Sequence, residues 1–225
     1  MADPQSETMR KTVVAVEENF PPFVHVEDGR VVGMAIETLD ALARRARLDL
    51  EYLPVPASCI PSILTEGKAD AAFPLAINPE RRAVFDFSDP VLVTGGGFFV
   101  AAPSPAPVAL DDLRAKRIAT PATGPLAAFL RTLAPDMILV PTSDYIEPLR
   151  LVVSGEADAA ALNLEAGCML VERFFHGQIT MPKMHFLKLP MALGVPKRSV
   201  EKSFILYRIN EAIKSAHGTN ILDDE

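Results

Sequence analysis

The residue in this sequence best suited to hold a ligand is Arg81, which directly follows Asn78–Glu80 (NPE). Pro79 is suited to open a short helical turn, because the first helical position needs no backbone N–H donor. A guanidinium at such a turn can grip a carboxylate through two parallel charge-assisted hydrogen bonds. The same residue chemistry equally allows a salt bridge from Arg81 to Glu80 or Asp86. Arg81 is therefore a candidate carboxylate-binding residue with a structural alternative.

A second candidate for anion binding is the expected helix start at Thr123, Gly124 and Pro125. Pro is well placed at the first helical position, and the start of a helix presents free backbone N–H groups to an anion. Thr123 can instead serve as an ordinary helix cap. Both roles fit the residue types, so the segment is a candidate site and nothing more at this stage.

Little in the sequence indicates covalent, metal or nucleotide chemistry. Cys59, Cys168 and the four scattered histidines match no metal or redox spacing, so we expect two free thiols, no metal and no organic cofactor. No nucleophile–base pair stands out. The segment Gly95–Gly97 lacks the Gly-Lys-Ser/Thr ending of a phosphate-binding loop and more simply loosens a strand.

Length and composition narrow the class of protein. The 225 residues exceed one typical domain, and almost half are apolar, so one large core or two smaller ones can be buried. A net charge of -7 argues against a nucleic-acid partner. The first residues lack the basic and apolar segments of a secretory signal, so either the protein is cytosolic or its signal was removed.

Short apolar runs alternate with helical patterns along the chain. Thr12–Val16 and Leu50–Val55 are rich in β-branched and apolar residues and predict strands. Apolar residues at three- and four-residue steps predict an amphipathic helix over Met34–Leu48. A short helix over Cys59–Glu66 should end at Gly67. This alternation is typical of α/β layers around a largely parallel sheet.

One unit occurs twice, which predicts two related lobes. Gly67–Phe73 (GKADAAF) and Gly155–Ala161 (GEADAAA) share a helix-ending Gly and then Ala-Asp-Ala-Ala at the start of a strand. Extended segments that meet Pro breaks near residues 102 and 189 are the expected crossovers. We therefore predict a discontinuous lobe 1 over residues 10–101 and 190–225, and a lobe 2 over residues 102–189. A cleft between two such α/β lobes is the expected ligand site, with the crossovers as a hinge.

Several segments together resemble the bacterial extracellular solute-binding proteins of family 3. The opening of that family is similar to Asn19–Phe23 (NFPPF) followed by Gly33–Asp40 (GMAIETLD). Its other motifs resemble Ile60–Asp70 (IPSILTEGKAD) and Leu110–Ile118 (LDDLRAKRI). The most specific match is INPERR with FDFSDP, within residues 77–90. The likeness extends over roughly residues 12–215, nearly the whole chain.

The resemblance implies a two-lobed periplasmic-binding-protein-like fold of type II, the Venus flytrap, with a ligand cleft between the lobes. By the same resemblance, Arg81 holds the carboxylate of the ligand and Phe20 forms an aromatic wall over it. The further ligand-binding positions that it indicates are Glu17, Phe73, Ala76, Thr123, Gly124 and Asn163.

Asn163 departs from the family pattern in an informative way. Family members that bind α-amino acids usually have an Asp at this strand end, which pairs with the ammonium of the ligand. An amide supplies no compensating charge, and a buried unpaired charge is costly. Glu165, Glu17 or Glu18 can substitute. Pro56, Pro74 and Ala76 also replace residues with which the family usually contacts its ligand. We therefore favour an organic acid or modified amino acid as ligand over a standard amino acid held in a different way.

The resemblance leaves three functions open. We expect an extracytoplasmic or periplasmic, monomeric binding protein that captures a small carboxylate-bearing molecule for the membrane permease of an ABC importer. The alternative is the ligand-sensing ectodomain of a signalling receptor. A third, less favoured function is that of an enzyme resembling the cyclohexadienyl dehydratases of this fold, with Glu165 or Glu17 as proton donor. We expect no catalysis and no nucleic-acid partner.

Overall fold

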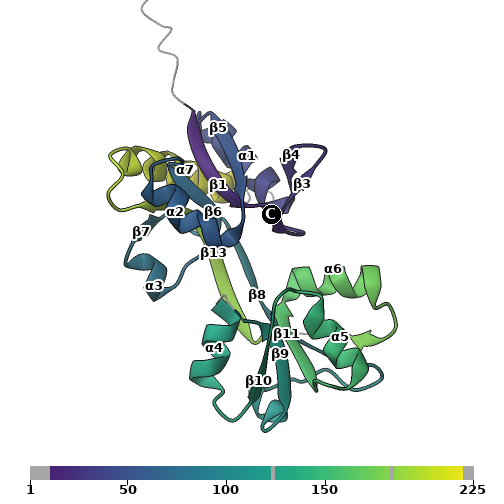
Figure 1. The fold of residues 1–225 in the computed structure, drawn as a ribbon. Helices are drawn as coiled ribbons and strands as arrows, with labels where there is room; N and C mark the ends of the chain where they lie inside the picture. Colours follow the sequence, from purple (N-terminus) through teal and green to yellow (C-terminus); the bar gives the residue numbers. More distant parts are fainter. Residues whose placement is uncertain (1–10, 123–124, 183–184, 220–225) are drawn as a thin grey trace, which may run out of the picture. The chain divides into compact units, whose positions relative to one another are not determined.

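The computed structural model describes residues 11–122, 125–182 and 185–219, which form two compact units (Figure 1). Within these ranges, unit 1 consists of residues 11–92 and 191–219, and unit 2 of the described residues from 93 to 190. The chain passes between the units at Leu92/Val93 and at Pro190/Met191. The sequence placed the corresponding boundaries at 101/102 and 189/190.

Unit 1 is a layered α/β structure built on strands that pair in the order β13-β6-β1-β5, with β7 beside β13 and a small separate sheet β2-β3-β4. Its elements are β1 (Thr12–Glu17), β2 (Asn19–Phe20), β3 (Val24–Glu27), β4 (Arg30–Val32), α1 (Met34–Ala46), β5 (Leu50–Val55), the 3₁₀ helix η1 (Ala57–Cys59), α2 (Ile60–Thr65), β6 (Ala71–Ala76), α3 (Pro79–Arg82), β7 (Phe85–Phe87) and α7 (Lys202–Thr219). Strands β8 (Leu92–Ala101) and β13 (Leu187–Pro196) extend across the unit boundaries.

Unit 2 repeats this layering with strands in the order β10-β9-β11-β8, and β12 beside β8. Its elements are the 3₁₀ helix η2 (Leu110–Leu113), β9 (Arg117–Pro121), α4 (Pro125–Leu133), β10 (Ile138–Thr142), α5 (Glu147–Ser154), β11 (Ala159–Asn163), α6 (Leu164–Phe174) and β12 (Ile179–Thr180). Thr123 and Gly124 lie outside the described residues. None of the helices in the described ranges combines the length and the apolar composition needed to cross a bilayer.

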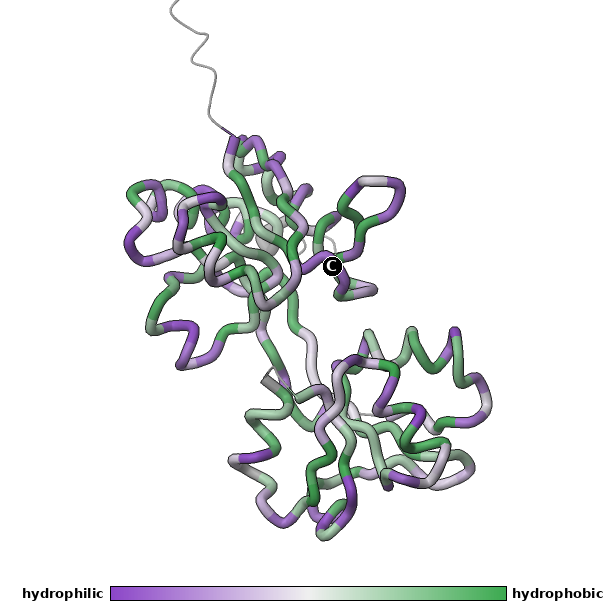
Figure 2. Tube along the Cα trace, in the orientation of Figure 1, coloured by the Kyte–Doolittle hydropathy of each residue, from purple (hydrophilic) through white to green (hydrophobic). Residues whose placement is uncertain are grey.

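Helices pack on both faces of the sheet in each unit. Successive residues of a strand point to opposite sides, so a single strand contributes to both packed layers. In β1, Val14 and Val16 pack with α1 and α7, whereas the intervening Ala15 packs with Leu64 of α2. In β11 of unit 2, Ala160 and Leu162 pack with α5 and α6, and Ala161 packs with α4. Hydrophobic residues accordingly gather along the strands of both units (Figure 2).

The expected α/β layering is confirmed, but the sheets are mixed rather than largely parallel. The central pairings of β1 with β5 and β6, and of β9 with β10 and β11, are parallel. Strands β8 and β13 instead join β11 and β6 in antiparallel pairs. An apolar run carries no information on strand direction, which is why the sequence pattern missed these pairings.

The repeated Gly and Asp occupy the same structural positions in both units. Gly67 and Gly155 have φ angles of +71° and +78° just after α2 and α5, as the helix-ending glycines predicted. In unit 1, Asp70 Oδ2 accepts the backbone N–H of Val13 at 2.9 Å, and Asp70 N–H donates to Val13 O at 2.8 Å. The same reciprocal pair, both bonds at 2.8 Å, joins Asp158 to Arg117 in unit 2. The repeated Asp thus ties the start of β6 to β1 in unit 1 and the start of β11 to β9 in unit 2.

Gly95–Gly97 form a close contact surface inside unit 2. A Cβ atom on Gly95 would collide with Leu187 O and the ring of His185, and one on Gly96 would collide with the ring of Phe186. Phe186 stacks on Phe98 with ring centroids 4.1 Å apart. Three glycines are needed here because Pro182, His185, Phe186 and Leu187 pack directly on the backbone of β8.

Removing the carboxylate of Asp70 should destabilise unit 1. Asp70→Ala leaves the partly buried N–H of Val13 without its acceptor, and such a loss costs about 1–3 kcal/mol of unfolding free energy. Asp49→Ala removes an exposed carboxylate of the same unit and should cost less than about 0.5 kcal/mol. Urea denaturation measures both values, and equal stabilities of the two variants would contradict the role given to Asp70.

Candidate functional site

Arg81 is held in place by the turn that follows β6. The side chain of Asn78 caps α3 by accepting the backbone N–H of Arg81 at 2.7 Å. Pro79 fills the first helical position, where no N–H is required. The guanidinium folds back over the turn, and its Nη1 donates to Ala76 O at 3.1 Å. The local sequence therefore fixes the guanidinium beside the carboxyl end of β6.

The guanidinium of Arg81 is partly buried without a carboxylate partner. Burial lowers the pKa of Arg81, while the nearby charges of Glu17 and Glu80 oppose that shift. Among the described residues no acidic group forms an ion pair with it within 4 Å. Asp86, the alternative partner considered from the sequence, pairs with Lys202 at 2.9 Å. Within the described ranges, one of the five N–H donors of Arg81 bonds to a protein acceptor, so Arg81 can still bind an anion.

Glu17 lies at the end of the neighbouring strand β1. Strands β1 and β6 are parallel partners, with Val14 opposite Ala71, so their carboxyl ends reach the same edge of the sheet. Burial raises the pKa of Glu17 from 4.5 to about 7, although the positive charge of Arg81 lowers it. Glu17 is therefore close to half-ionised at neutral pH beside a cation that remains charged.

The other unit 1 residues expected at the site have different environments. Ala76 is buried and contributes its carbonyl oxygen to Arg81. Phe20 is partly buried and stacks on Phe23 with ring centroids 4.9 Å apart. Phe73 is only 1% exposed and lies inside the hydrophobic core of unit 1. The structure thus brings Glu17, Ala76 and Arg81 together at one sheet edge and places the side chain of Phe73 in the core.

In unit 2, both polar groups of Asn163 are engaged by the protein. Its side-chain oxygen caps α6 by accepting the N–H of Ala166 at 3.1 Å, and its Nδ2 donates to Thr94 Oγ1 at 2.7 Å. The hydroxyl of Thr94 donates in turn to Glu165 Oε2. His185 Nε2 lies 3.9 Å from the second oxygen of Glu165. An amide at position 163 can donate a hydrogen bond to the hydroxyl of Thr94, which an ionised carboxylate at the same position could not do. The acidic group of this network is Glu165, two residues later.

Sequence reasoning named Asn163 and Glu165 but missed Thr94 and His185. Thr94 falls in a run that is typical of a strand, and His185 had no motif around it. The substitution of an amide for the usual Asp, with a Glu two residues on, was the only local signal of the network. Thr123 and Gly124, also predicted at the site, lie outside the described residues.

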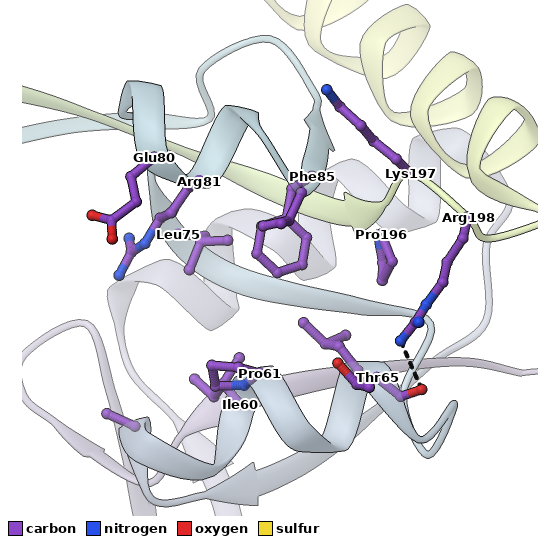
Figure 3. A pocket seen from close by; sticks show the side chains of 13 residues that line it. Ile60, Pro61, Thr65, Leu75, Glu80, Arg81, Phe85, Pro196, Lys197 and Arg198 are labelled. Carbon is purple, nitrogen blue, oxygen red and sulfur yellow. Dashed lines mark hydrogen bonds between the residues drawn. The ribbon is translucent and has the colours of Figure 1, made fainter.

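A pocket of about 680 Å³ adjoins Arg81 within unit 1 (Figure 3). Its lining comes from η1, α2, the end of β6, α3, the start of β7, and the end of β13 with the segment that follows it. Apolar side chains, including Leu75 and Phe85, lie between Arg81 on one side and Arg198 on the other. No motif in the sequence predicted this pocket, because its walls come from segments far apart in the chain.

Two similar α/β units, each with polar side chains at the ends of its strands, are typical of two-lobed periplasmic binding proteins, and this chain has that architecture. Within that class, residues 12–223 match the bacterial extracellular solute-binding proteins, family 3, and the chain belongs to this family. Both the expected fold and the expected family are thereby confirmed.

Two curated relatives illustrate the range of the family. The virulence sensor protein BvgS of Bordetella pertussis is 28% identical over 207 residues, which cover 90% of this chain and 16% of that protein. The probable amino-acid-binding protein YxeM of Bacillus subtilis is 27% identical over 141 residues, 61% of this chain and 53% of that protein. The chain therefore spans only 16% of the length of the first and about half of the second.

Solved structures give the same assignment of the fold. The periplasmic VFT2 domain of Bordetella pertussis BvgS superposes with a TM-score of 0.78 at 25% identity, covering 91% of this chain and 87% of that domain. A histidine kinase sensor domain with similarity to periplasmic binding proteins superposes with a TM-score of 0.79 at 22% identity, covering 94% and 92%.

Replacing Glu17 by Gln should stabilise the protein in a pH-dependent way. Because the pKa of Glu17 in the folded state, about 7, lies above 4.5, the protonated form favours folding. The stability that protonated Glu17 contributes is fully present below about pH 4.5 and is lost as the pH rises through about 7. Gln mimics the neutral acid, so Glu17→Gln should raise Tm by several degrees at about pH 8, through at most about 3 kcal/mol, and by little at about pH 4. A Tm difference independent of pH would refute the assignment.

Asn163→Asp should destabilise unit 2 at neutral pH. The new carboxylate cannot donate to Thr94 and adds a second negative charge at the hydroxyl that already serves Glu165, at an expected cost of about 1–3 kcal/mol. Adding Glu165→Gln removes the like charge and should recover most of that loss. Urea denaturation of the single and double variants gives the coupling free energy, and strictly additive effects would contradict the network.

Proposed function

We propose that this domain captures a small carboxylate-bearing molecule, with Arg81 as the residue that grips the carboxylate. The observation that carries this proposal is a partly buried guanidinium, fixed by Asn78 and Ala76, with no ion pair within 4 Å in the described part of the chain. Desolvating a cation without a partner is costly, and a bound carboxylate would offset that cost with paired hydrogen bonds.

The proposed ligand is an organic acid or a modified amino acid that lacks a free α-ammonium group. The side-chain oxygen of Asn163 already accepts the N–H of Ala166, and one carboxylate oxygen of Glu165 already accepts the hydroxyl of Thr94. Glu17 has a pKa of about 7, so at neutral pH it is only partly available as an anion for an ammonium group. In its protonated form Glu17 would instead donate a hydrogen bond to a ligand oxygen. A standard amino acid held in another way is the alternative.

We propose sensing as the leading role of the domain, with an extracytoplasmic location. The relative that covers 90% of this chain is a virulence sensor protein, whereas the probable amino-acid-binding protein covers 61%. Supply of a membrane permease in an ABC importer, the role expected first from the sequence, is the second candidate and draws support from that shorter relative. The coding sequence on either side of this chain would distinguish the two roles. A kinase domain encoded in the same reading frame would support sensing, and an adjoining permease gene would support import.

In either role the domain binds its ligand without changing it. Glu17 has the raised pKa that a general acid would need, so this part of the proposal requires its own check. Ligand recovered after prolonged incubation with the protein should be chemically intact by mass spectrometry and NMR. Accumulation of a dehydrated or decarboxylated product would establish an enzyme.

A thermal-shift screen with two ligand panels tests the proposal. One panel contains the standard amino acids, and the other contains carboxylic acids without an α-amine. A ligand that binds only the folded protein raises Tm by an amount that grows with its concentration above Kd. We expect stabilisation by a member of the second panel, its loss in Arg81→Ala, and its retention in Arg82→Ala, which removes an exposed arginine from the same short helix.

Two results of this screen would contradict the proposal. Stabilisation that survives in Arg81→Ala would show that another residue holds the carboxylate. Stabilisation by standard amino acids alone would show that a group other than Asn163 recognises the ammonium.

A further inference from the structure

The pocket beside α2 has the size and lining of a small-molecule site. Its volume of about 680 Å³ lies in the range of ligand pockets. Leu64 and Leu75, exposed by 4% and 6%, and the partly buried Phe85 supply an apolar wall. Val84 also lines the pocket and is 56% exposed, so water still covers much of its apolar side chain. An apolar molecule bound there would remove this surface from water.

The cations of the pocket lack acidic partners. Arg198 lies at the side away from Arg81 (Figure 3), and its Nη2 donates to Thr65 O at 2.8 Å. Over the described residues, Arg81, Lys197 and Arg198 form no ion pair within 4 Å. The acidic member of the lining is Glu80, which lies on the Arg81 side. The Arg198 side therefore carries a net positive charge that pairs with no carboxylate in the described part of the chain.

Arg198 is better placed than Arg81 to bind an anion inside this pocket. Arg81 is the proposed carboxylate grip of the other ligand, and the acidic side chain of Glu80 lies on its side of the pocket. Arg198 donates to a neutral backbone carbonyl, and as far as the structure describes the chain its other N–H donors remain for a ligand. That bond also fixes the guanidinium against the end of α2, which reduces the ordering cost of binding.

We propose that the α2 pocket is a second binding site, which takes a carboxylic acid with an apolar alkyl or aryl body. The carboxylate pairs with Arg198, and the apolar body lies against Leu64, Leu75 and Phe85. Arg81 also lines this pocket, but the second site uses Arg198 as its cation and therefore does not depend on the proposed carboxylate grip of Arg81. Both parts of the ligand are needed, because the wall supplies apolar contact and Arg198 supplies the charge.

Calorimetric titration with three probes tests both parts. Octanoate carries the charge and the apolar body, octanamide lacks the charge, and acetate lacks the body. We expect octanoate to bind measurably more tightly than either control. Arg198→Ala should weaken octanoate binding by roughly tenfold or more, as expected for losing a charged hydrogen-bond partner. Arg30→Ala, which removes an exposed arginine of the β4 strand in the same unit, should leave the affinity unchanged.

A second variant blocks the pocket without altering its charge. Ala57 lies exposed in η1 and lines the pocket, so Ala57→Trp should fill the space and abolish octanoate binding while the protein stays folded. Failure of octanoate to bind the wild-type protein would overturn the proposal. Binding that persists unchanged in both Arg198→Ala and Ala57→Trp would overturn it as well, because octanoate would then occupy another site.

Discussion

The cost of holding a partly buried guanidinium without a carboxylate is the physical constraint on which this site depends. Water removed from Arg81 must be replaced by other polar groups, and among the described residues only the carbonyl of Ala76 accepts a hydrogen bond from its guanidinium. Asn78 and Pro79 fix the turn that keeps the guanidinium there. In the proposed function a ligand carboxylate supplies the missing interaction, so that incomplete compensation in the free protein would become binding free energy in the complex.

The same constraint explains why Glu17 stays close to Arg81 without forming a salt bridge with it. A direct pair would neutralise the guanidinium and leave little for a ligand. Burial instead raises the pKa of Glu17 to about 7, which keeps a large fraction of this carboxyl neutral at physiological pH. The parallel pairing of β1 with β6 sets this arrangement, and the reciprocal bonds of Asp70 and Val13 hold the two strands in register.

Features that depend on local chemistry could be predicted from the sequence. The left-handed Gly67 and Gly155, the strand Leu50–Val55 and the turn before Arg81 follow from neighbouring residues, and the structure contains each of them. Features that depend on distant contacts could not. Asn163 and Thr94 are 69 positions apart, and nothing near either residue announces their hydrogen bond. Likewise, no local pattern encodes the burial that shifts the pKa of Glu17, or the meeting of α2 with the end of β13 around the pocket.

The number of protons exchanged on binding tests the central claim, that a ligand carboxylate binds Arg81 beside Glu17. Calorimetry near pH 7 in two buffers with different ionisation enthalpies measures it for the acid that stabilises the protein most. A carboxylate at Arg81 adds negative charge near Glu17 and raises its pKa further, so we predict uptake of a fraction of one proton and none in Glu17→Gln. Proton release would instead place an ammonium group beside Glu17, and the absence of any exchange would place the ligand elsewhere. Either of those two results would contradict the account.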